Sequence, residues 1–283
     1  MAQSGVQVKW RTAECRVRGA AHKLKDKPCQ DAVKAIETPD GVILAVADGH
    51  GSERSPNSAE GAEAAVDVAI EQLQPFFKNC CKPPAKPNSI ERFTLPDGLP
   101  RKITQEWWSR ILFKETSGED IPLNEDEKNE IFRKYGATLL AVVASAEYLV
   151  IFQLGDGDVL LVDEDGSINR PIERDPRLFA DETTSLCLPE AWLSMEVKSI
   201  PISNNPPALI LVSTDGYSNS FVSTEDFEQT GSDYLQAIRR DGLEAVSAKL
   251  EGWLNEASEQ GSGDDITLGI ICRADMAKGE TER

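Results

Sequence analysis

Residues 42–51 read VILAVADGHG. Residues 42–47 are six apolar residues in succession, and a short run of this kind that ends in turn residues is typical of a strand buried on both faces. Asp48-Gly49-His50-Gly51 predicts a tight turn directly after it, because glycine adopts positive φ angles without steric cost. The stretch therefore predicts an interior strand with a carboxylate and an imidazole at its end.

A helix is expected after this turn. Asn57 is a suitable N-cap, and Glu60 follows at the spacing of a capping box. Val66, Ile70 and Leu73 recur at intervals of three or four residues, which places them on one helical face. The region thus predicts a strand, a tight turn and a helix in sequence.

Short apolar runs later in the chain predict further strands. These runs occupy residues 137–144, 148–154, 159–162, 168 onward, 208–212 and 266–272. Helices are expected at 103–115 and 127–134, and another helix carries Leu243, Val246, Leu250, Trp253 and Leu254. This order is not the regular alternation of a parallel α/β fold, and it predicts an α+β fold of two sheets with helices packed outside them.

The segments between these elements are expected to be loops. They cover residues 80–101, 117–126 and 170–207, and the first and last of them are expected to shape target choice. In the helix 103–115, Trp107 and Ile111 lie on one face, where a role in the core is favoured over a ligand platform.

Composition limits the kinds of partner. The chain has 283 residues, 40% of them hydrophobic, and we expect one domain over residues 1–283. The net charge of −18 repels the phosphates of nucleic acid and anionic membrane surfaces, so neither is an expected partner. No apolar run approaches the roughly 20 residues of a membrane-spanning helix. The N-terminus shows no signal-peptide pattern, and none of the six cysteines has CxxC spacing. We therefore expect reduced thiols in a cytoplasmic protein.

Aspartates at the predicted strand ends carry the chemistry. Asp48, Asp156 and Asp215 each follow a buried apolar strand directly or almost directly, and Asp264 precedes one. Ends of neighbouring strands converge at one sheet edge, and carboxylates within about 4–6 Å of one another cannot all stay ionised unless a cation neutralises them. With few histidines and no cysteine cluster, Mg²⁺ or Mn²⁺ is favoured over zinc.

Two such ions about 3.5–4 Å apart can activate a water for attack on phosphorus, so no side-chain nucleophile is required. That agrees with a chain that has no GxSxG motif and only two histidines, His22 and His50. His50 could donate a proton to the leaving oxygen, or it could be a structural residue that hydrogen-bonds the turn. Both interpretations of His50 remain open at this point.

The order of the motifs resembles the metal-dependent serine/threonine phosphatases of type 2C. The matching pieces are Gln30-Asp31, residues 46–51, Gly136-Ala137-Thr138 with Gly155-Asp156, residues 213–216 and residues 263–267. They extend from about residue 15 to residue 272, so the resemblance covers nearly the whole chain. Residues 179–184 are also similar to a segment in a bacterial branch of that family.

The resemblance implies a central sandwich of two antiparallel β-sheets flanked by helices on both sides. It also implies Mn²⁺ or Mg²⁺ as cofactor, two ions with a third, weaker site, and a phosphorylated protein as partner; it gives no oligomeric state. The expected metal ligands are Asp31, Asp48, the carbonyl of Gly49, Asp156, Asp215 and Asp264.

Within that set the resemblance assigns individual roles. Asp48 would bridge both ions, and Asp215 with Asp264 would complete one of the two sites. Asp31 would hold either an ion or its water, and Asp156 would help to form the third site. The two catalytic residues would be Asp48, as the bridging ligand, and His50, as the general acid.

Three positions depart from the family pattern. Gln30 stands where glutamate is usual, and Asp265 stands where asparagine is frequent. Asp26 occupies the position of an expected phosphate-binding arginine. Nearby cations could substitute for it, with His22 and Lys23 as the leading candidates and Lys25 and Lys27 as the others, although these lysines could equally belong to a solvated loop.

The leading functional hypothesis is therefore hydrolysis of phosphoserine or phosphothreonine in proteins. Gln30 and the missing arginine motivate an alternative, a pseudophosphatase that binds phosphoproteins without turnover. A second alternative is a phosphatase with an aspartyl-phosphate intermediate on Asp156-Gly157-Asp158, although that motif belongs in a parallel α/β domain. A calcium-binding loop at residues 156–166 is excluded, because its Asp and Gly positions do not fit the required register.

Overall fold

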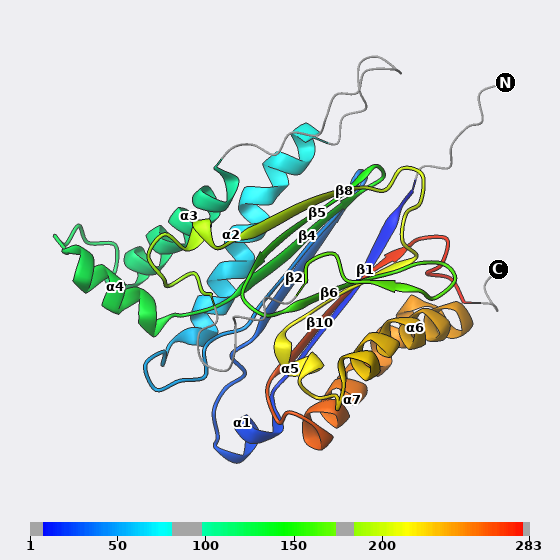
Figure 1. Cartoon of the computed structure of the whole chain (residues 1–283). Coiled ribbons are helices and arrows are strands. Elements are labelled where there is room, and N and C mark those ends of the chain that lie inside the picture. The colour runs from blue at the N-terminus through cyan, green and yellow to red at the C-terminus, as the bar shows by residue number, and fades with distance from the viewer. Residues whose placement is uncertain (1–7, 81–97, 174–183, 280–283) are drawn as a thin grey trace.

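The computed structural model describes residues 8–80, 98–173 and 184–279. In these residues ten strands form two five-stranded antiparallel sheets that lie face to face (Figure 1). The first sheet has the order β1 (Trp10–Val17), β10 (Ile266–Arg273), β9 (Leu209–Ser213), β6 (Asp158–Val162) and β7 (Ile168–Asn169). The second has the order β2 (Ala32–Thr38), β3 (Gly41–Ala47), β4 (Leu139–Ser145), β5 (Tyr148–Leu154) and β8 (Glu196–Pro201).

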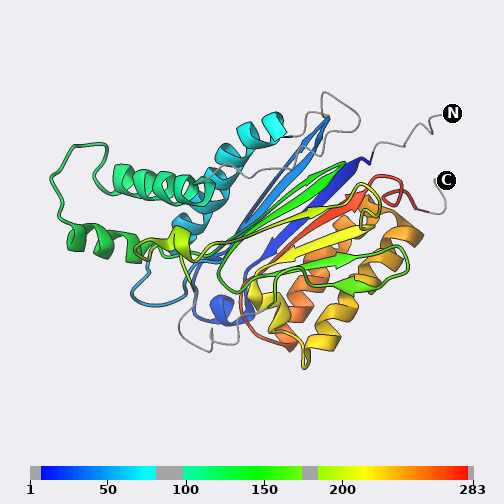
Figure 2. The same ribbon diagram turned by 45° about the horizontal axis from the view of Figure 1, so that its top comes forward.

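Helices cover the outer face of each sheet. The second sheet is covered by α2 (Ser58–Cys80), and α3 (Leu99–Glu115) and α4 (Glu125–Lys134) extend outward beyond α2 (Figure 2). The first sheet is covered by α6 (Thr224–Asp241) and α7 (Leu243–Gln260). The short helices are α1 (Ala20–Leu24), α5 (Asp215–Ser218) and the 3-10 turn η1 (Ala191–Leu193).

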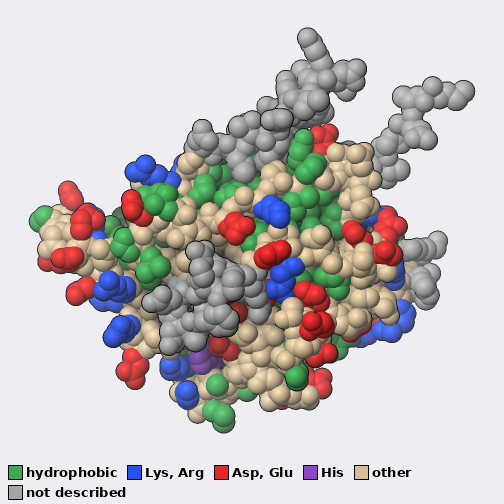
Figure 3. Space-filling view, viewed as in Figure 1, with side chains coloured by type: hydrophobic (Ala, Val, Ile, Leu, Met, Phe, Trp, Pro, Cys, Tyr) green, Lys and Arg blue, Asp and Glu red, His purple; other side chains and the backbone are tan. Residues whose placement is uncertain are grey.

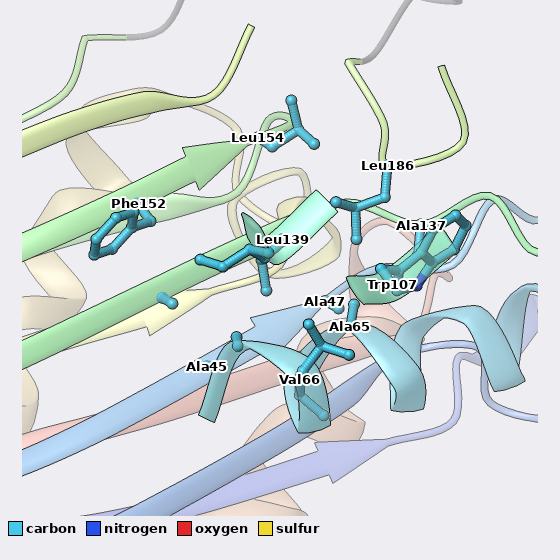
Figure 4. Close-up of a cluster of buried hydrophobic side chains, with 14 of the residues drawn as sticks. Ala45, Ala47, Ala65, Val66, Trp107, Ala137, Leu139, Phe152, Leu154 and Leu186 are labelled. Atoms are coloured by element: carbon cyan, nitrogen blue, oxygen red, sulfur yellow. The ribbon is translucent and has the colours of Figure 1, made fainter. Parts of the chain in front are cut away.

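Strand β3 shows why the interior strands are apolar throughout. Ile43, Ala45 and Ala47 face the core beneath α2 and α3, whereas Val42, Leu44 and Val46 face the core between the two sheets. Successive side chains of a strand point to opposite faces, and both faces of β3 are covered. Figure 4 shows Ala45 and Ala47 beside Ala65 and Val66 of α2, with Trp107 of α3 nearby.

A third core lies between the first sheet and the helices α6 and α7. It contains Leu209 and Leu211 of β9, whose neighbours Ile210 and Val212 face the other sheet. Leu243, Val246, Leu250 and Leu254 of α7 are buried there, as their helical spacing predicts. Trp253 is the exception: it is 36% exposed, although it follows the same helical spacing.

The predicted sandwich flanked by helices is confirmed, with differences at several boundaries. The predicted loop at 80–101 is wrong at its end, because α3 begins at Leu99 with proline in its first turn; residues 81–97 lie outside the described part. Helix α4 starts earlier than predicted, since Asn124 and Glu127 form a capping box. The predicted loop at 170–207 contains η1 and β8.

Other expectations concern the chain's surface and thiols. Acidic side chains are spread over the face shown in Figure 3, with basic ones among them. Among the described cysteines, Cys15, Cys29, Cys187 and Cys272 are free thiols. No described helix has both the length and the apolar character needed to cross a membrane. The parallel α/β domain required for an aspartyl-phosphate motif is absent from the described chain, in which residues 155–157 connect β5 of one antiparallel sheet to β6 of the other.

Candidate active site

The strand pairing brings the predicted aspartates to one end of the sandwich. In the second sheet the start of β2 pairs with the end of β3, and the start of β4 pairs with the end of β5. In the first sheet the end of β9 pairs with the starts of both β6 and β10. Asp31, Asp48, Asp156, Asp215 and Asp264 all flank these strand ends. The expected convergence of strand ends is therefore what the topology provides.

The electrostatics show how close these carboxylates lie. The pKa of Asp48 is raised well above its ordinary value, first by loss of solvation and then by the charges of Asp31, Asp215, Asp264 and Asp156. Removal from water likewise raises the pKa of Asp215 to about 6, with Asp156 and Asp264 adding to it, although a hydrogen bond with Asp48 opposes the rise. The other four carboxylates thus all act on Asp48, and two of them also act on Asp215.

Asp31 lies deepest in this group, with 1% of its surface exposed. Burial raises its pKa to about 7, and the charges of Asp265 and Asp264 add to the effect, whereas the hydroxyls of Thr214 and Thr267 oppose it. Thr214 Oγ1 donates a hydrogen bond of 2.8 Å to Asp31 Oδ2. Thr214 also precedes Asp215, so one residue links the two strand ends.

Local hydrogen bonds hold Asp48 and Asp215 in place. The backbone N–H of Asp48 donates to Thr138 Oγ1 at 2.9 Å, and Thr138 N–H donates to the Asp48 carbonyl at 2.8 Å. Asp215 begins α5, and Asn219 one turn later donates from Nδ2 to Asp215 Oδ2 at 2.9 Å. These contacts fix the backbone of Asp48 and the carboxylate of Asp215.

Gly49 and His50 are placed by close backbone packing. The N–H of Gly49 donates to the Gln30 carbonyl at 3.1 Å, and a Cβ at Gly49 would lie 2.6 Å from that oxygen. The N–H of His50 donates to the Gly136 carbonyl at 3.0 Å, and a Cβ at Gly136 would lie 2.3 Å from His50 Cδ2. The glycine of the Gly136-Ala137-Thr138 motif therefore leaves room for the imidazole. Burial lowers the pKa of His50, and the charge of Asp156 opposes this.

Asp265 organises the loop that carries the candidate phosphate-binding residues. Its Oδ1 accepts from Gly19 N–H at 2.6 Å, and its Oδ2 accepts from Gln30 N–H at 2.6 Å. The same Oδ2 lies 2.9 Å from Nδ1 of His22. Asparagine, which is frequent at this position in the family, has only one side-chain acceptor oxygen. Aspartate has two and uses both here, which is a physical reason for this departure from the family pattern.

Gln30 presents a side-chain oxygen without a hydrogen-bond partner. Its Nε2 donates to Ser58 Oγ at 2.6 Å, and its Oε1 has no partner among the described residues although Gln30 is 6% exposed. A Cβ at Gly51 would lie 3.4 Å from this Oε1 and 3.8 Å from Nε2 of His22. The oxygen therefore faces the turn that begins at Asp48.

The lysines of the N-terminal loop differ in direction. Lys23 Nζ donates to Asn255 Oδ1 of α7 at 2.6 Å, whereas Lys27 Nζ donates to the Gly51 carbonyl at 3.1 Å. Asp26, where arginine was expected, has a positive φ of 52°. Of the candidate cations, His22 and Lys27 lie nearest to the turn at residues 48–51, and Lys23 is directed toward α7.

The donor chemistry of this end suits a hard cation. The candidate metal ligands are side-chain oxygens, which hard divalent cations prefer. The pKa values of three of the carboxylates are raised, and the side-chain oxygen of Gln30 is buried without a hydrogen-bond partner. No three His, Cys, Asp or Glu side chains in the described ranges already surround one ion position. Mg²⁺ and Mn²⁺ commonly keep waters and carbonyl oxygens among their ligands, so the residues present fit such an ion.

Three contacts in this site were not predicted from the sequence. Thr214 reaches Asp31 across 183 residues, and Asp265 reaches His22 across 243, so local spacing carries no signal for either. Asn219 could have been found, because it lies four residues after Asp215, one helical turn along. Residues 179–183 of the segment similar to the bacterial branch lie outside the described residues, and Thr184 Oγ1 accepts from Gly155 N–H at 2.9 Å.

Known structures with the same fold are numerous, at low sequence identity. The catalytic domain of the serine/threonine protein phosphatase PstP, in complex with two manganese ions, has a TM-score of 0.54 and 18% identity, covering 94% of this chain and 98% of that one. Serine/threonine phosphatase Stp1 from Staphylococcus aureus has a TM-score of 0.60 and 14% identity, covering 96% and 97%. PppA of Pseudomonas aeruginosa, a regulatory component of its T6SS, has a TM-score of 0.56 and 15% identity, covering 94% and 98%.

Sequence comparison gives the family directly. A comparison with curated proteins produced no significant match. The family model described as Protein phosphatase 2C matches residues 18–255, which is most of the chain and includes Asp31, Asp48, Asp156 and Asp215. The motif order, the sandwich and this match agree, and the chain belongs to the protein phosphatase 2C family.

Proposed function

We propose that this chain is a Mn²⁺- or Mg²⁺-dependent phosphatase of phosphoserine and phosphothreonine in proteins. The observation that carries the proposal is the mutual effect of five carboxylates at one end of the sandwich, where the charges of four raise the pKa of Asp48. Such a group is costly unless cations neutralise it, and the donors are those that hard divalent ions prefer. The family match over residues 18–255 supports a phosphoprotein as substrate, and we propose residues 1–283 as one catalytic domain.

The residues that would hold the ions are Asp48, Asp215, Asp264 and the Gly49 carbonyl, and Asp31 and Asp156 would contribute further oxygen ligands. When bound, two such ions lower the pKa of a water and polarise the phosphate. Residues of the chain hold these aspartates in position. Thr138 holds the backbone of Asp48, and Asn219 holds the carboxylate of Asp215, by the hydrogen bonds described above.

The proton for the leaving oxygen is assigned to His50. Its imidazole lies against Gly136 in the turn that Asp48 begins; burial lowers its pKa, and the charge of Asp156 opposes that lowering. The phosphate of the substrate would be held by cations of the N-terminal loop. His22 is braced by Asp265, and Lys27 contacts Gly51, so these two join Lys23 as candidates in place of arginine.

A pseudophosphatase that binds phosphoproteins without turnover is the alternative. Gln30 favours it, because a neutral amide binds a divalent ion less strongly than a carboxylate does, and Asp26 favours it, because the loop lacks a bidentate arginine at that position. In that case a phosphopeptide would bind without divalent ions and no phosphate would be released.

The decisive experiment measures phosphate release from phosphothreonine and phosphoserine peptides against Mn²⁺ concentration, for the wild type and for Asp48→Asn. We expect saturable, chelator-sensitive activity that Asp48→Asn lowers by about 100-fold or more, because the bridging charge is lost while the shape is kept. Glu164→Gln removes one carboxylate at the opposite end of the sandwich and should leave turnover unchanged. Activity that survives complete removal of divalent ions would refute the mechanism. Phosphopeptide binding without turnover would establish the alternative.

A further inference from the structure

A cavity of about 430 Å³ lies between α5, α6 and α7. Aromatic side chains form much of its wall: Tyr217 and Phe221 come from α5 and the residues after it, Tyr234 from α6, and Trp253 from α7. The cavity also has two acidic lining residues, Asp233 and Glu256. Its volume lies within the range of about 300–1,000 Å³ that is usual for small-ligand sites.

The aromatic rings are held in fixed orientations. Tyr217 and Phe221 meet edge to face, with ring centroids 5.2 Å apart and planes at 86°. Tyr234 and Trp253 pack at 5.8 Å and 60°. Trp253 is 36% exposed although its neighbours on the apolar face of α7 are buried. Its indole is thus turned from the core of the sandwich to the wall of the cavity.

The two carboxylates of the cavity have no cation beside them. Asp233 Oδ1 accepts from Gln229 Nε2 at 3.1 Å, and Glu256 Oε1 accepts from Gln260 Nε2 at 3.0 Å. Neither carboxylate forms an ion pair with any described residue of the chain.

The basic residues of α6 and α7 lie elsewhere on the helix pair. Arg240 and Lys249 both pair with Asp241 at the connection between the two helices, and Arg239 donates to the Glu164 carbonyl at 2.6 Å. These helices therefore place their cations at one end of the pair. The wall of the cavity is left aromatic and negatively charged.

We propose that this cavity is a recognition site for an arginine side chain presented by a basic segment of a partner polypeptide. A guanidinium can stack on the faces of tryptophan and tyrosine and can also bind carboxylates through its planar set of donors. Asp233 and Glu256 together provide the negative charge that it needs, whereas an anionic ligand would be repelled. The overall charge of −18 further favours approach of a basic segment.

The cavity adjoins the segments that carry two of the aspartates of the candidate active site. Tyr217 follows Asp215 by two residues, and Gln260, also a lining residue, is followed by Ser262 and Asp264. Ser262 Oγ donates to the Gly216 carbonyl at 2.9 Å, so the segments bearing Asp215 and Asp264 are joined where they leave the cavity wall. A polypeptide held here would lie next to the candidate active site. The proposal concerns binding and does not depend on turnover.

The test uses a capped Gly-Gly-Arg-Gly-Gly peptide and the same peptide with citrulline, which keeps the shape of arginine and removes its charge. Titrations of tryptophan fluorescence are compared for the wild type, Trp253→Phe and the double variant Asp233→Asn/Glu256→Gln. Glu225→Gln/Glu259→Gln is the matched control, because it removes the same charge from exposed positions of the same two helices that do not line the cavity.

We expect saturable binding of the arginine peptide that weakens with added salt and is about tenfold tighter than binding of the citrulline peptide. The spectral change should vanish in Trp253→Phe, and the affinity should fall about tenfold in Asp233→Asn/Glu256→Gln while the control binds as the wild type does. Equal binding of the two peptides, absence of saturable binding, or an undiminished affinity in Asp233→Asn/Glu256→Gln would each overturn the proposal.

Discussion

The two ends of strand β10 handle charge in opposite ways. Before its first residue, Asp264 and Asp265 enter a group of carboxylates whose charges raise the pKa of Asp31. At its last residue, Arg273 pairs with Asp275 at 2.8 Å and with Glu164, and these hydrogen bonds raise the pKa of the guanidinium. One strand thus connects an end where like charges are gathered with an end where opposite charges are matched.

The two ends of β10 therefore contribute differently to the stability of the fold: paired charges stabilise one end, and gathered like charges destabilise the other. At the Arg273 end, Arg273 is matched by Asp275 and Glu164 within the chain, so this group needs no ligand. At the Asp264 end the carboxylates lower the stability of the fold until something neutralises them, either a proton or a cation. A polar cluster that the chain leaves uncompensated is where a ligand is expected, and the following predictions test that contrast.

The largest expected effect is on the pH dependence of stability without divalent ions. The pKa of Asp215 is raised from 3.8 to about 6 and that of Asp31 to about 7, so the folded chain binds these protons more tightly than the unfolded chain does. The stabilising contribution is complete below the unfolded pKa and is lost as pH rises through the folded values. We expect the free energy of unfolding to fall by on the order of 3 kcal/mol between about pH 5 and pH 8.

Urea denaturation of the metal-free protein at several pH values measures this slope. His50, whose pKa is lowered by burial, acts in the opposite sense and reduces the slope without removing it. Mn²⁺ should raise stability more at high pH than at low pH, because protons compete for the same carboxylates. Asp48→Asn should flatten the profile. Metal-free stability that stays level or increases with pH would show that the carboxylates are not gathered as described.

At the other end of β10, Arg273→Met should lower stability and leave catalysis alone. Arg273 is 9% exposed and also donates to the Pro206 carbonyl at 3.2 Å, so its loss leaves an acceptor and two carboxylates without their donor. We expect a loss of about 1–2 kcal/mol in the free energy of unfolding. Arg240→Met is the matched control: Arg240 is exposed, so solvent screens its ion pair with Asp241 and its loss should change stability much less. A fall in kcat/KM for the folded Arg273→Met protein would contradict the separation of the two ends.

The interior strands could be predicted because burial on both faces leaves a continuous apolar run. Strands β3, β4, β9 and β10 each lie between helices and the opposite sheet, and nearly every residue in them is buried. Strand β1 escaped prediction because exposed and buried positions mix along it, and β8 did so because none of its residues is fully buried. Strand β2 was missed for a related reason, since only Ala32 in it is fully buried.

The meeting of Asp48, Asp215 and Asp264 followed from sequence because each flanks a strand that could be recognised. The partners of these residues did not follow, since hydrogen bonds such as Thr214 to Asp31 depend on which strands become neighbours. Trp253 shows the same limit in a helix. Its spacing matches the apolar face of α7, and only the position of α6 beside α7 decides that its indole faces a cavity.

The smallest effect is expected for Gln30→Glu, which restores the carboxylate usual in the family. A glutamate here can accept from Ser58 Oγ with one oxygen and present the other where Gln30 Oε1 is now unpaired. The added charge should tighten Mn²⁺ binding by about tenfold, because affinity for such ions rises with the number of charged ligands. It should also lower the stability of the metal-free protein near neutral pH, since one more carboxylate joins the group.

Calorimetric Mn²⁺ titration of Gln30→Glu and of Gln236→Glu separates this local effect from net charge. Gln236 lies exposed on α6, so its replacement adds the same charge away from the carboxylate end. Unchanged Mn²⁺ affinity in Gln30→Glu, or an equal gain in Gln236→Glu, would mean that the Gln30 oxygen does not face the ions. If Gln30→Glu instead binds Mn²⁺ more tightly and is less stable without metal, the side chain at position 30 belongs to the group whose charge the cations neutralise.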